Sequence, residues 1–195
     1  MTHKNLLKHP VIKNIGRIIN VAALILLATH GMYAWQAHTT AQNWEERVFI
    51  IERTWQFRLL NPAIGNAIGF TLPYLSIGYV NREAIERLGV DIEPVRRHEA
   101  KHLQQANQLG LLQFWRLDEW KREGMAEYVR GEPTVSLCSP NPEEDPNRLA
   151  YREFYIVTRY LIEKKGLTEE DLYEFEGYPL EEAEKWLVRT HCSQN

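Results

Sequence analysis

Several features that mark other protein classes are scarce in this sequence. Only two of its 195 residues are cysteines, and they do not form a CxxC pair, so they are not expected to be zinc ligands. Basic residues are not in excess, because 26 Asp and Glu outnumber 23 Lys and Arg and the formal net charge is −3. A chain without a basic surface is not expected to bind nucleic acid. Its length, with 44% hydrophobic and 25% charged residues, suits one compact domain plus an appendage.

The appendage is the N-terminal segment, which lacks acidic residues as far as Glu45. Its most apolar part, Ile18 to Trp35, follows a basic flank that contains Lys4, Lys8, Lys13 and Arg17. A basic flank before about 18 mostly apolar residues predicts a signal anchor whose basic end is cytoplasmic. We therefore expect a cytoplasmic segment at 1–17, a transmembrane helix at 18–37 and an extracytoplasmic domain at 43–195.

Two other interpretations of this segment stay open. Thr39-Thr40-Ala41 has the small residues of a signal-peptide cleavage site, so the segment could be removed from the mature protein. It could also be a buried amphipathic helix of a soluble protein. The long basic flank favours the uncleaved anchor, as do Trp35 and Trp44, whose positions suit interfacial anchors.

A second uncharged stretch runs from Leu59 to Asn81. Its glycines and prolines, together with Asn61 and Asn66, argue against a transmembrane helix. We predict an apolar loop that leads to a short strand at Leu75 to Val80, with a segment that dips into the membrane as the alternative. Just before it, bulky apolar residues at helical spacing predict a helix from Glu45 to Leu60.

The segment His98-Glu99-Ala100-Lys101-His102 is a candidate metal site. Residues four apart lie on one face of a helix, so both imidazoles can bind one ion while Glu99 lies beside a metal-bound water. Such a pair suits zinc, which needs a third protein ligand and an open fourth position for catalysis. Pro94 suits the first turn of this helix, and Gly110 suits its C-terminal cap.

The next predicted helix, from Asp118 to Gly131, contains Glu123-Gly124-Met125-Ala126-Glu127-Tyr128. Together the two segments resemble the gluzincin metallopeptidases, the group of thermolysin and the zinc aminopeptidases. The resemblance covers His98 to Gly166, and it implies a zincin-like domain, a zinc ion and a peptide or protein substrate. It also implies that Glu123 is the third zinc ligand and that Glu127 supports a ligand histidine.

A carboxylate at Glu127 has a physical reason, because a zinc-bound histidine donates its other ring N–H to such a group. One turn separates Glu127 from Glu123, so both lie on one face of the helix. The competing interpretation is that the two are solvated acids paired with Lys121 and Arg130.

Lys101 lies inside the motif, where zincins usually have an uncharged residue. In helical projection it belongs to a polar stripe with Arg97 and Gln104, rotated away from the stripe of His98 and His102. Lys101 can therefore face solvent without pointing at the metal. A cation this close would disfavour zinc, so weaker affinity or a degenerate site is an alternative.

A third helix is predicted from 146 to 165, after a loop rich in proline and acids, and Gly166 closes it. Its inward face carries Tyr151 and Tyr155. Either could donate a hydrogen bond to the oxyanion of hydrolysis, as a tyrosine or histidine often does in gluzincin-like enzymes. The similar helix of small bacterial peptidases in this group favours Tyr151. Core packing is the simpler alternative, and His191 is another conceivable donor.

The remaining segments complete the domain. Two short helices are expected, one from Thr168 and one from about Pro179. Cys138 and Cys192 could form a disulfide in an oxidising compartment and tie the C-terminal tail to the loop. They could equally remain two thiols, because spacing does not establish a pair.

The sequence therefore predicts a mainly α protein with a small β element, in which a zincin-like catalytic domain follows an N-terminal transmembrane helix. The expected activity is zinc-dependent peptide hydrolysis with Glu99 as general base and His98, His102 and Glu123 as zinc ligands. One alternative is a non-catalytic membrane-tethered module with a degenerate or structural zinc site, against which the intact Glu99 argues. Another treats the histidines as a coincidence on an amphipathic helix.

Overall fold

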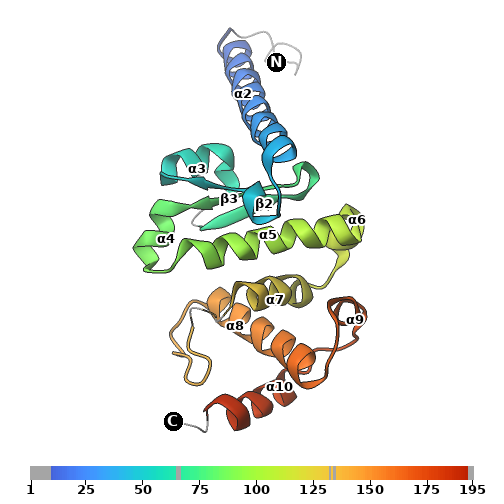
Figure 1. The fold of residues 1–195 in the computed structure, drawn as a ribbon. Coiled ribbons are helices and arrows are strands. Elements are labelled where there is room, and N and C mark those ends of the chain that lie inside the picture. The colour runs from blue at the N-terminus through green and yellow to red at the C-terminus, as the bar shows by residue number, and fades with distance from the viewer. Residues whose placement is uncertain (1–9, 65–66, 132, 134, 193–195) are drawn as a thin grey trace, which may run out of the picture.

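The computed structural model describes residues 10–64, 67–131, 133 and 135–192, with the backbone alone for 10–17 (Figure 1). Lys4, Lys8 and Asn66, which carry parts of the sequence predictions, lie outside the described residues. So does Glu132, the first residue of the loop rich in proline and acids that is predicted before the third helix. Most of the described chain is helical and three short strands form one sheet. The prediction of a mainly α protein with a small β element is thus confirmed.

The N-terminal helix α2 (Pro10–Thr40) contains a segment, Ile18–Thr40, that is long and apolar enough to cross a bilayer. Its apolar side chains face outward, since those of Leu24 and Leu27 are 65% and 69% exposed. The interpretation as a buried helix of a soluble protein does not fit this exposure. Among the α2 side chains that the structure describes, from Ile18 onward, the buried one is Ala37, in the C-terminal part of the helix.

Three strands form the sheet: β1 (Val48–Ile51), β2 (Gly69–Leu72) and β3 (Ile77–Asn81). The central strand β3 is parallel to β1 and antiparallel to β2. The strand expected at 75–80 is confirmed as β3, whereas the sequence pattern does not indicate β2.

The prediction of a single helix from Glu45 to Leu60 is wrong. The segment forms a 3-10 turn, η1 (Glu45–Arg47), then β1, then the short helix α3 (Thr54–Leu60). Val48 to Ile51 are four consecutive apolar residues, three of them β-branched, which suit a strand covered on both faces. A short uninterrupted apolar run fits the periodicity of a helix as well as that of a strand. The helical spacing of the apolar residues on either side therefore predicts one helix through this run, and that helix does not form.

The two faces of the sheet belong to two apolar cores. One face carries Ile77 and Tyr79 and packs against α2 and α3. The other carries Val48 and Val80 and packs against α5 (Ile92–Leu109), the helix of the histidine motif. Because side chains alternate along a strand, α2 and α5 lie on opposite sides of the sheet (Figure 1).

Short elements connect these layers. A 3-10 turn, η2 (Pro62–Ile64), follows α3, and a second one, η3 (Pro73–Leu75), joins β2 to β3. The helix α4 (Arg82–Leu88) precedes α5 and is capped by Asn81, whose side chain accepts a hydrogen bond from the Ala84 N–H at 3.2 Å.

The motif helices form where the sequence predicts them. Gly110 ends α5, α6 (Leu111–Arg116) follows, and α7 (Glu119–Arg130) matches the helix expected from 118 to 131. Helix α7 packs against both α5 and α8 (Pro146–Arg159). A Cβ atom added to Gly124 would lie 2.3 Å from Thr158 Oγ1, so glycine at this position lets α7 and α8 approach closely.

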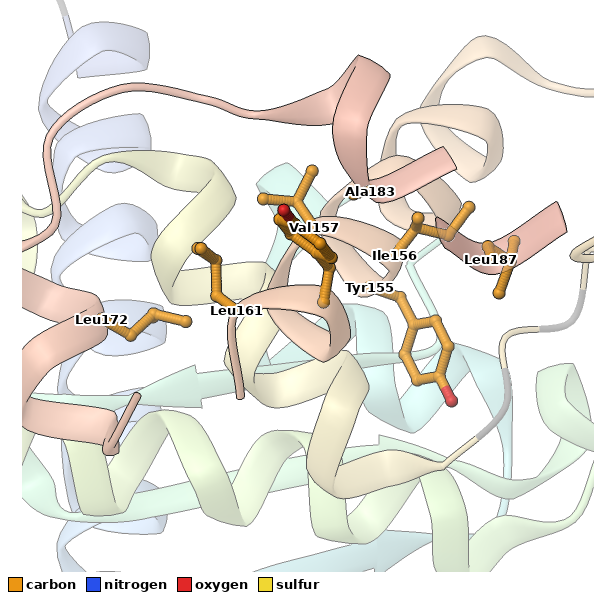
Figure 2. Packing of buried hydrophobic residues seen from close by; sticks show 8 residues of the cluster. Tyr155, Ile156, Val157, Leu161, Leu172, Ala183 and Leu187 are labelled. Atoms are coloured by element: carbon orange, nitrogen blue, oxygen red, sulfur yellow. The ribbon is translucent and has the colours of Figure 1, made fainter. Parts of the chain in front are cut away.

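The C-terminal elements also follow the sequence pattern. Helix α8 continues into a π-helical segment, η4 (Tyr160–Lys164), and is followed by α9 (Glu169–Glu174), α10 (Leu180–Leu187) and a second π-helical segment, η5 (Val188–Cys192). Figure 2 shows the apolar core that these elements share, whose labelled members are Tyr155, Ile156, Val157, Leu161, Leu172, Ala183 and Leu187. This core supports α8, which in turn supports α7.

Cys138 and Cys192 form a disulfide with a Cα–Cα distance of 5.5 Å. The bond ties the end of η5 to the loop between α7 and α8. Of the two arrangements that the sequence leaves open, the disulfide is therefore the one present.

Candidate metal centre

Three side chains from α5 and α7 converge on one point. The Nε2 atoms of His98 and His102 are 3.1 Å apart, and Glu123 Oε2 lies 3.1 Å from His102 Nε2 and 3.5 Å from His98 Nε2. Among the described residues, these three form the one group of His, Cys, Asp or Glu side chains placed to hold a metal ion. The structure thus brings together the three ligands expected from the sequence.

The separations suit a tetrahedral ion. Ligand atoms at about 2.0 to 2.2 Å from a tetrahedral zinc lie about 3.3 to 3.6 Å from one another. The three observed separations, 3.1, 3.1 and 3.5 Å, are close to this range. Two imidazole nitrogens and one carboxylate oxygen are also a donor set that zinc prefers, so the residues fit the ion.

Each histidine is oriented by a partner at its other nitrogen. His98 Nδ1 lies 2.9 Å from Glu127 Oε1, and His102 Nδ1 lies 3.1 Å from Gln105 Oε1. The Gln105 amide nitrogen donates to the Arg122 carbonyl at 3.1 Å, which directs the amide oxygen toward His102. His102 therefore donates from Nδ1 to Gln105 and presents the lone pair of Nε2 to the candidate metal position, whereas the contact of His98 Nδ1 with Glu127 is close in distance but is not aligned as a hydrogen bond.

The carboxylates of the site are buried and held in place. Glu123 and Glu127 are 8% and 2% exposed, which excludes the interpretation as two solvated acids. Arg122 Nε donates to Glu123 Oε1 at 3.2 Å, so the other oxygen, Oε2, is the one that faces the histidines. Arg130 Nη1 donates to Glu127 Oε1 at 2.9 Å, while Lys121 pairs with Asp118 instead.

The electrostatics of the group favour an added positive charge. Burial lowers the pKa of His98, but its close contacts with the carboxylates of Glu123 and Glu127 outweigh burial and raise the pKa to about 10. Burial raises the pKa of Glu123, but the charge and hydrogen bonds of His102 and His98 outweigh it and hold that pKa far below its usual range. Without a metal, the carboxylates thus stabilise a proton on the histidine, and they would stabilise the positive charge of a divalent cation in the same way.

Glu99 lies beside the ligands and faces a cavity of about 600 Å³ that His98 and Tyr151 also line. Burial raises the pKa of the Glu99 carboxyl, against the opposing effect of the two histidines. A Cβ atom added to Gly69, at the start of β2, would lie 2.3 Å from Glu99 Oε1. A glycine in the strand is therefore what leaves room for the carboxylate.

The two candidate tyrosines have different environments. The Tyr151 ring lies 6.3 Å from the His98 ring, and burial and the nearby carboxylates raise its pKa, so the hydroxyl stays protonated and can donate. Tyr155 belongs to the core in Figure 2 and is 5% exposed, so core packing accounts for it. His191 is at the surface, where Nε2 lies 2.6 Å from Arg159 Nη2, and it does not line the cavity.

The inference that Lys101 can face solvent is wrong. Its side chain is buried, with Nζ 2.5 Å from Glu169 Oε2 and 3.1 Å from Gln104 Oε1. The helical projection places Lys101 on a different stripe from the histidines, but it does not foresee that Glu169 of α9 lies against Lys101. Because Glu169 neutralises the ammonium group, Lys101 forms a buried structural ion pair with it beside the candidate metal site.

Sequence reasoning does not identify two residues that shape the site. Gln105 lies three positions after His102, a spacing that brings side chains together on a helix and could have indicated it. Gly69 has no such signal, because its contact with Glu99 depends on how β2 packs against α5.

Comparisons of the sequence and the structure with known protein families, curated proteins and solved structures found no match. A function for this chain is therefore inferred from the geometry of its own site.

The contact between Glu127 and His98 predicts a measurable effect on metal affinity. Glu127→Ala is expected to weaken zinc binding about ten- to a hundred-fold, because the His98 ring loses the acceptor that fixes its orientation and tautomer. A competitive chelator titration of the purified protein measures this change. Glu127→Gln, which keeps an acceptor oxygen, serves as the matched control. Equal affinity for wild type and Glu127→Ala would contradict the assigned role.

Proposed function

We propose that this protein is a membrane-anchored zinc metallopeptidase of gluzincin type. The observation that carries the proposal is the convergence of His98 Nε2, His102 Nε2 and Glu123 Oε2, with separations of 3.1 to 3.5 Å, beside Glu99 at the wall of a cavity. The conclusion is drawn from this arrangement together with the resemblance of the two motif segments to gluzincins.

The arrangement favours a catalytic over a structural site. Structural zinc sites are closed by four protein ligands, whereas catalytic sites have three and keep one position open. The group found among the described residues has three members. A buried carboxylate that is not a ligand, Glu99, has no purpose in a structural site but is the base that hydrolysis needs.

In the proposed mechanism, His98, His102 and Glu123 would hold the ion. Zinc bound there would supply a Lewis acid and lower the pKa of a water molecule. Glu99 accepts a proton from the attacking water and later delivers it to the nitrogen of the leaving amine. Tyr151, which lines the cavity and whose hydroxyl stays protonated, donates a hydrogen bond to the developing oxyanion.

The proposed substrate is a peptide or protein, and the proposed location of the domain is outside the cytoplasm. The basic flank at 1–17 supports a cytoplasmic N-terminus by the positive-inside rule. The disulfide between Cys138 and Cys192 also supports this orientation, because structural disulfides persist in oxidising compartments.

A cleavage assay tests the proposal. The full chain, purified in detergent and loaded with zinc, is incubated with a broad peptide library, and products are identified by mass spectrometry. We expect cleavage that a zinc chelator removes and that added zinc restores. A protein that binds zinc at this site and cleaves no peptide would instead be the non-catalytic module.

A further inference from the structure

Four large apolar side chains on α2 and on two elements that contact it, α3 and η3, are exposed. They are Trp35 on α2, Trp55 and Leu59 on α3, and Tyr74 on η3, with exposures of 69%, 62%, 59% and 64%. We name this set the collar. Both α3 and η3 contact α2, so the collar lies where the candidate membrane helix enters the domain. Figure 1 shows α3 beside the lower end of α2, on the side of the sheet opposite α5.

The domain docks onto α2 well before the apolar segment ends. His30 Nε2 donates to the Leu60 carbonyl at 3.1 Å, and the Tyr79 hydroxyl lies 2.9 Å from His30 Nδ1. From Ile18 to Thr29, the part of the apolar segment before this contact has 12 residues. Twelve helical residues rise about 18 Å, whereas the hydrocarbon core of a bilayer is about 30 Å thick.

The rest of the hydrocarbon core must therefore be crossed by the part of α2 that packs against the domain. About eight more residues of α2 are needed to cross the hydrocarbon core, which carries the span to residues that pack against α3 and the sheet. If α2 crosses the bilayer, the elements that pack against its residues 30–37 lie at the depth of the leaflet on the side of the domain.

The chemistry of this region suits that depth. No residue from Leu59 to Asn81 is charged, and this range includes η2, η3 and Tyr74. Two polar side chains on α2 near this level have partners within the protein, because His30 binds Leu60 and Tyr79, and Thr29 Oγ1 donates to the Ile25 carbonyl at 2.8 Å. Polar groups in a membrane need such internal partners, and Trp and Tyr are enriched at the interface.

We propose that the collar is a second membrane-binding surface, inserted into the leaflet from which α2 emerges, with the lipid bilayer itself as the partner. The domain is then partly immersed and not merely tethered by a linker. The proposal depends on α2 spanning the membrane and is independent of the peptidase activity.

This insertion fixes the distance of the metal site from the membrane. Strand β2 begins at Gly69, against Glu99, and ends at Leu72, next to the η3 turn that carries Tyr74. Three steps along a strand cover about 10 Å. The site would thus be held close to the membrane surface.

The test measures the depth of single positions in the full chain, reconstituted in phosphatidylcholine nanodiscs. The two native cysteines are joined in the disulfide, so one added cysteine is a unique thiol for an environment-sensitive fluorophore. The labelled variants are Leu59→Cys and Tyr74→Cys in the collar, and Ile25→Cys, 60% exposed on α2, as the membrane reference. Leu112→Cys on α6 is the matched aqueous control, because Leu112 is a leucine that is 76% exposed and α6 follows α5, the helix on the face of the sheet opposite α2.

Lipids with nitroxide quenchers near the headgroup end of the acyl chain are then added. We expect loss of fluorescence at Leu59→Cys and Tyr74→Cys and none at Leu112→Cys, with Ile25→Cys quenched by nitroxides deeper in the chain. Collar labels that behave like the Leu112→Cys label, while Ile25→Cys is quenched, would overturn the proposal. Absence of quenching at Ile25→Cys would overturn it too, because α2 would then not span the bilayer.

Discussion

Replacing Glu99 by glutamine is expected to lower kcat for peptide cleavage by about 10²- to 10⁴-fold and to leave zinc bound, because the amide cannot accept the proton of the attacking water. Glutamine has nearly the size of glutamate, and none of the three ligands changes. The close approach of Gly69 to Glu99 is also preserved. The effect therefore reports on chemistry and not on the fold.

The measurement compares kcat and zinc content of wild type and Glu99→Gln on a peptide identified in the library assay. Glu93→Gln is the matched control, since Glu93 is on the same helix, pairs with Arg96 at 3.5 Å and does not line the cavity. Its kcat should equal that of wild type. Equal kcat for wild type and Glu99→Gln would show that Glu99 is not the base.

His98→Ala is expected to abolish both zinc binding and activity. Two remaining ligands hold zinc poorly, and Glu127 loses the ring that it orients. The readout is thermal unfolding with and without zinc, because a ligand that binds only the folded state stabilises it by about 2.7 kcal/mol at a concentration 100 times its Kd. Wild type should show this rise in Tm with zinc, and His98→Ala should show none.

Two comparisons keep this result interpretable. Far-UV circular dichroism of His98→Ala without zinc should match that of wild type, because Arg122 and Arg130 still pair with Glu123 and Glu127. His191→Ala, which removes a surface histidine outside the cavity, should keep the full zinc-dependent rise in Tm. If His98→Ala binds zinc as tightly as wild type, the ion is held elsewhere.

Local signals explain why much of the fold could be predicted from the sequence. The boundaries of α5 and α7 follow from capping residues and apolar periodicity, both of which are local along the chain. The strand β1 could not be found in this way, because Val48 to Ile51 form a strand through pairing with β3, about thirty residues later. Lys101 was misplaced for the same reason, since its partner Glu169 comes from α9.

In the candidate site, too, some features follow from local sequence and others depend on tertiary packing. His98, His102 and Glu123 were predictable because helical spacing and the second motif place them, and Glu127 was predictable from the needs of a bound histidine. The contact of Gly69 with Glu99, and the separation of Tyr151 in the cavity from Tyr155 in the core, depend on how elements pack in three dimensions.

Zinc K-edge X-ray absorption of the purified full chain, combined with its metal content by mass spectrometry, tests whether His98, His102 and Glu123 bind zinc. We expect about one zinc per chain, with nitrogen and oxygen neighbours at about 2.0 to 2.2 Å and no sulfur. We also expect the imidazole scattering of two histidines, and its loss in His98→Ala. A protein that retains no zinc after loading, or a zinc with sulfur neighbours at about 2.3 Å, would contradict the assignment of His98, His102 and Glu123 as the metal centre.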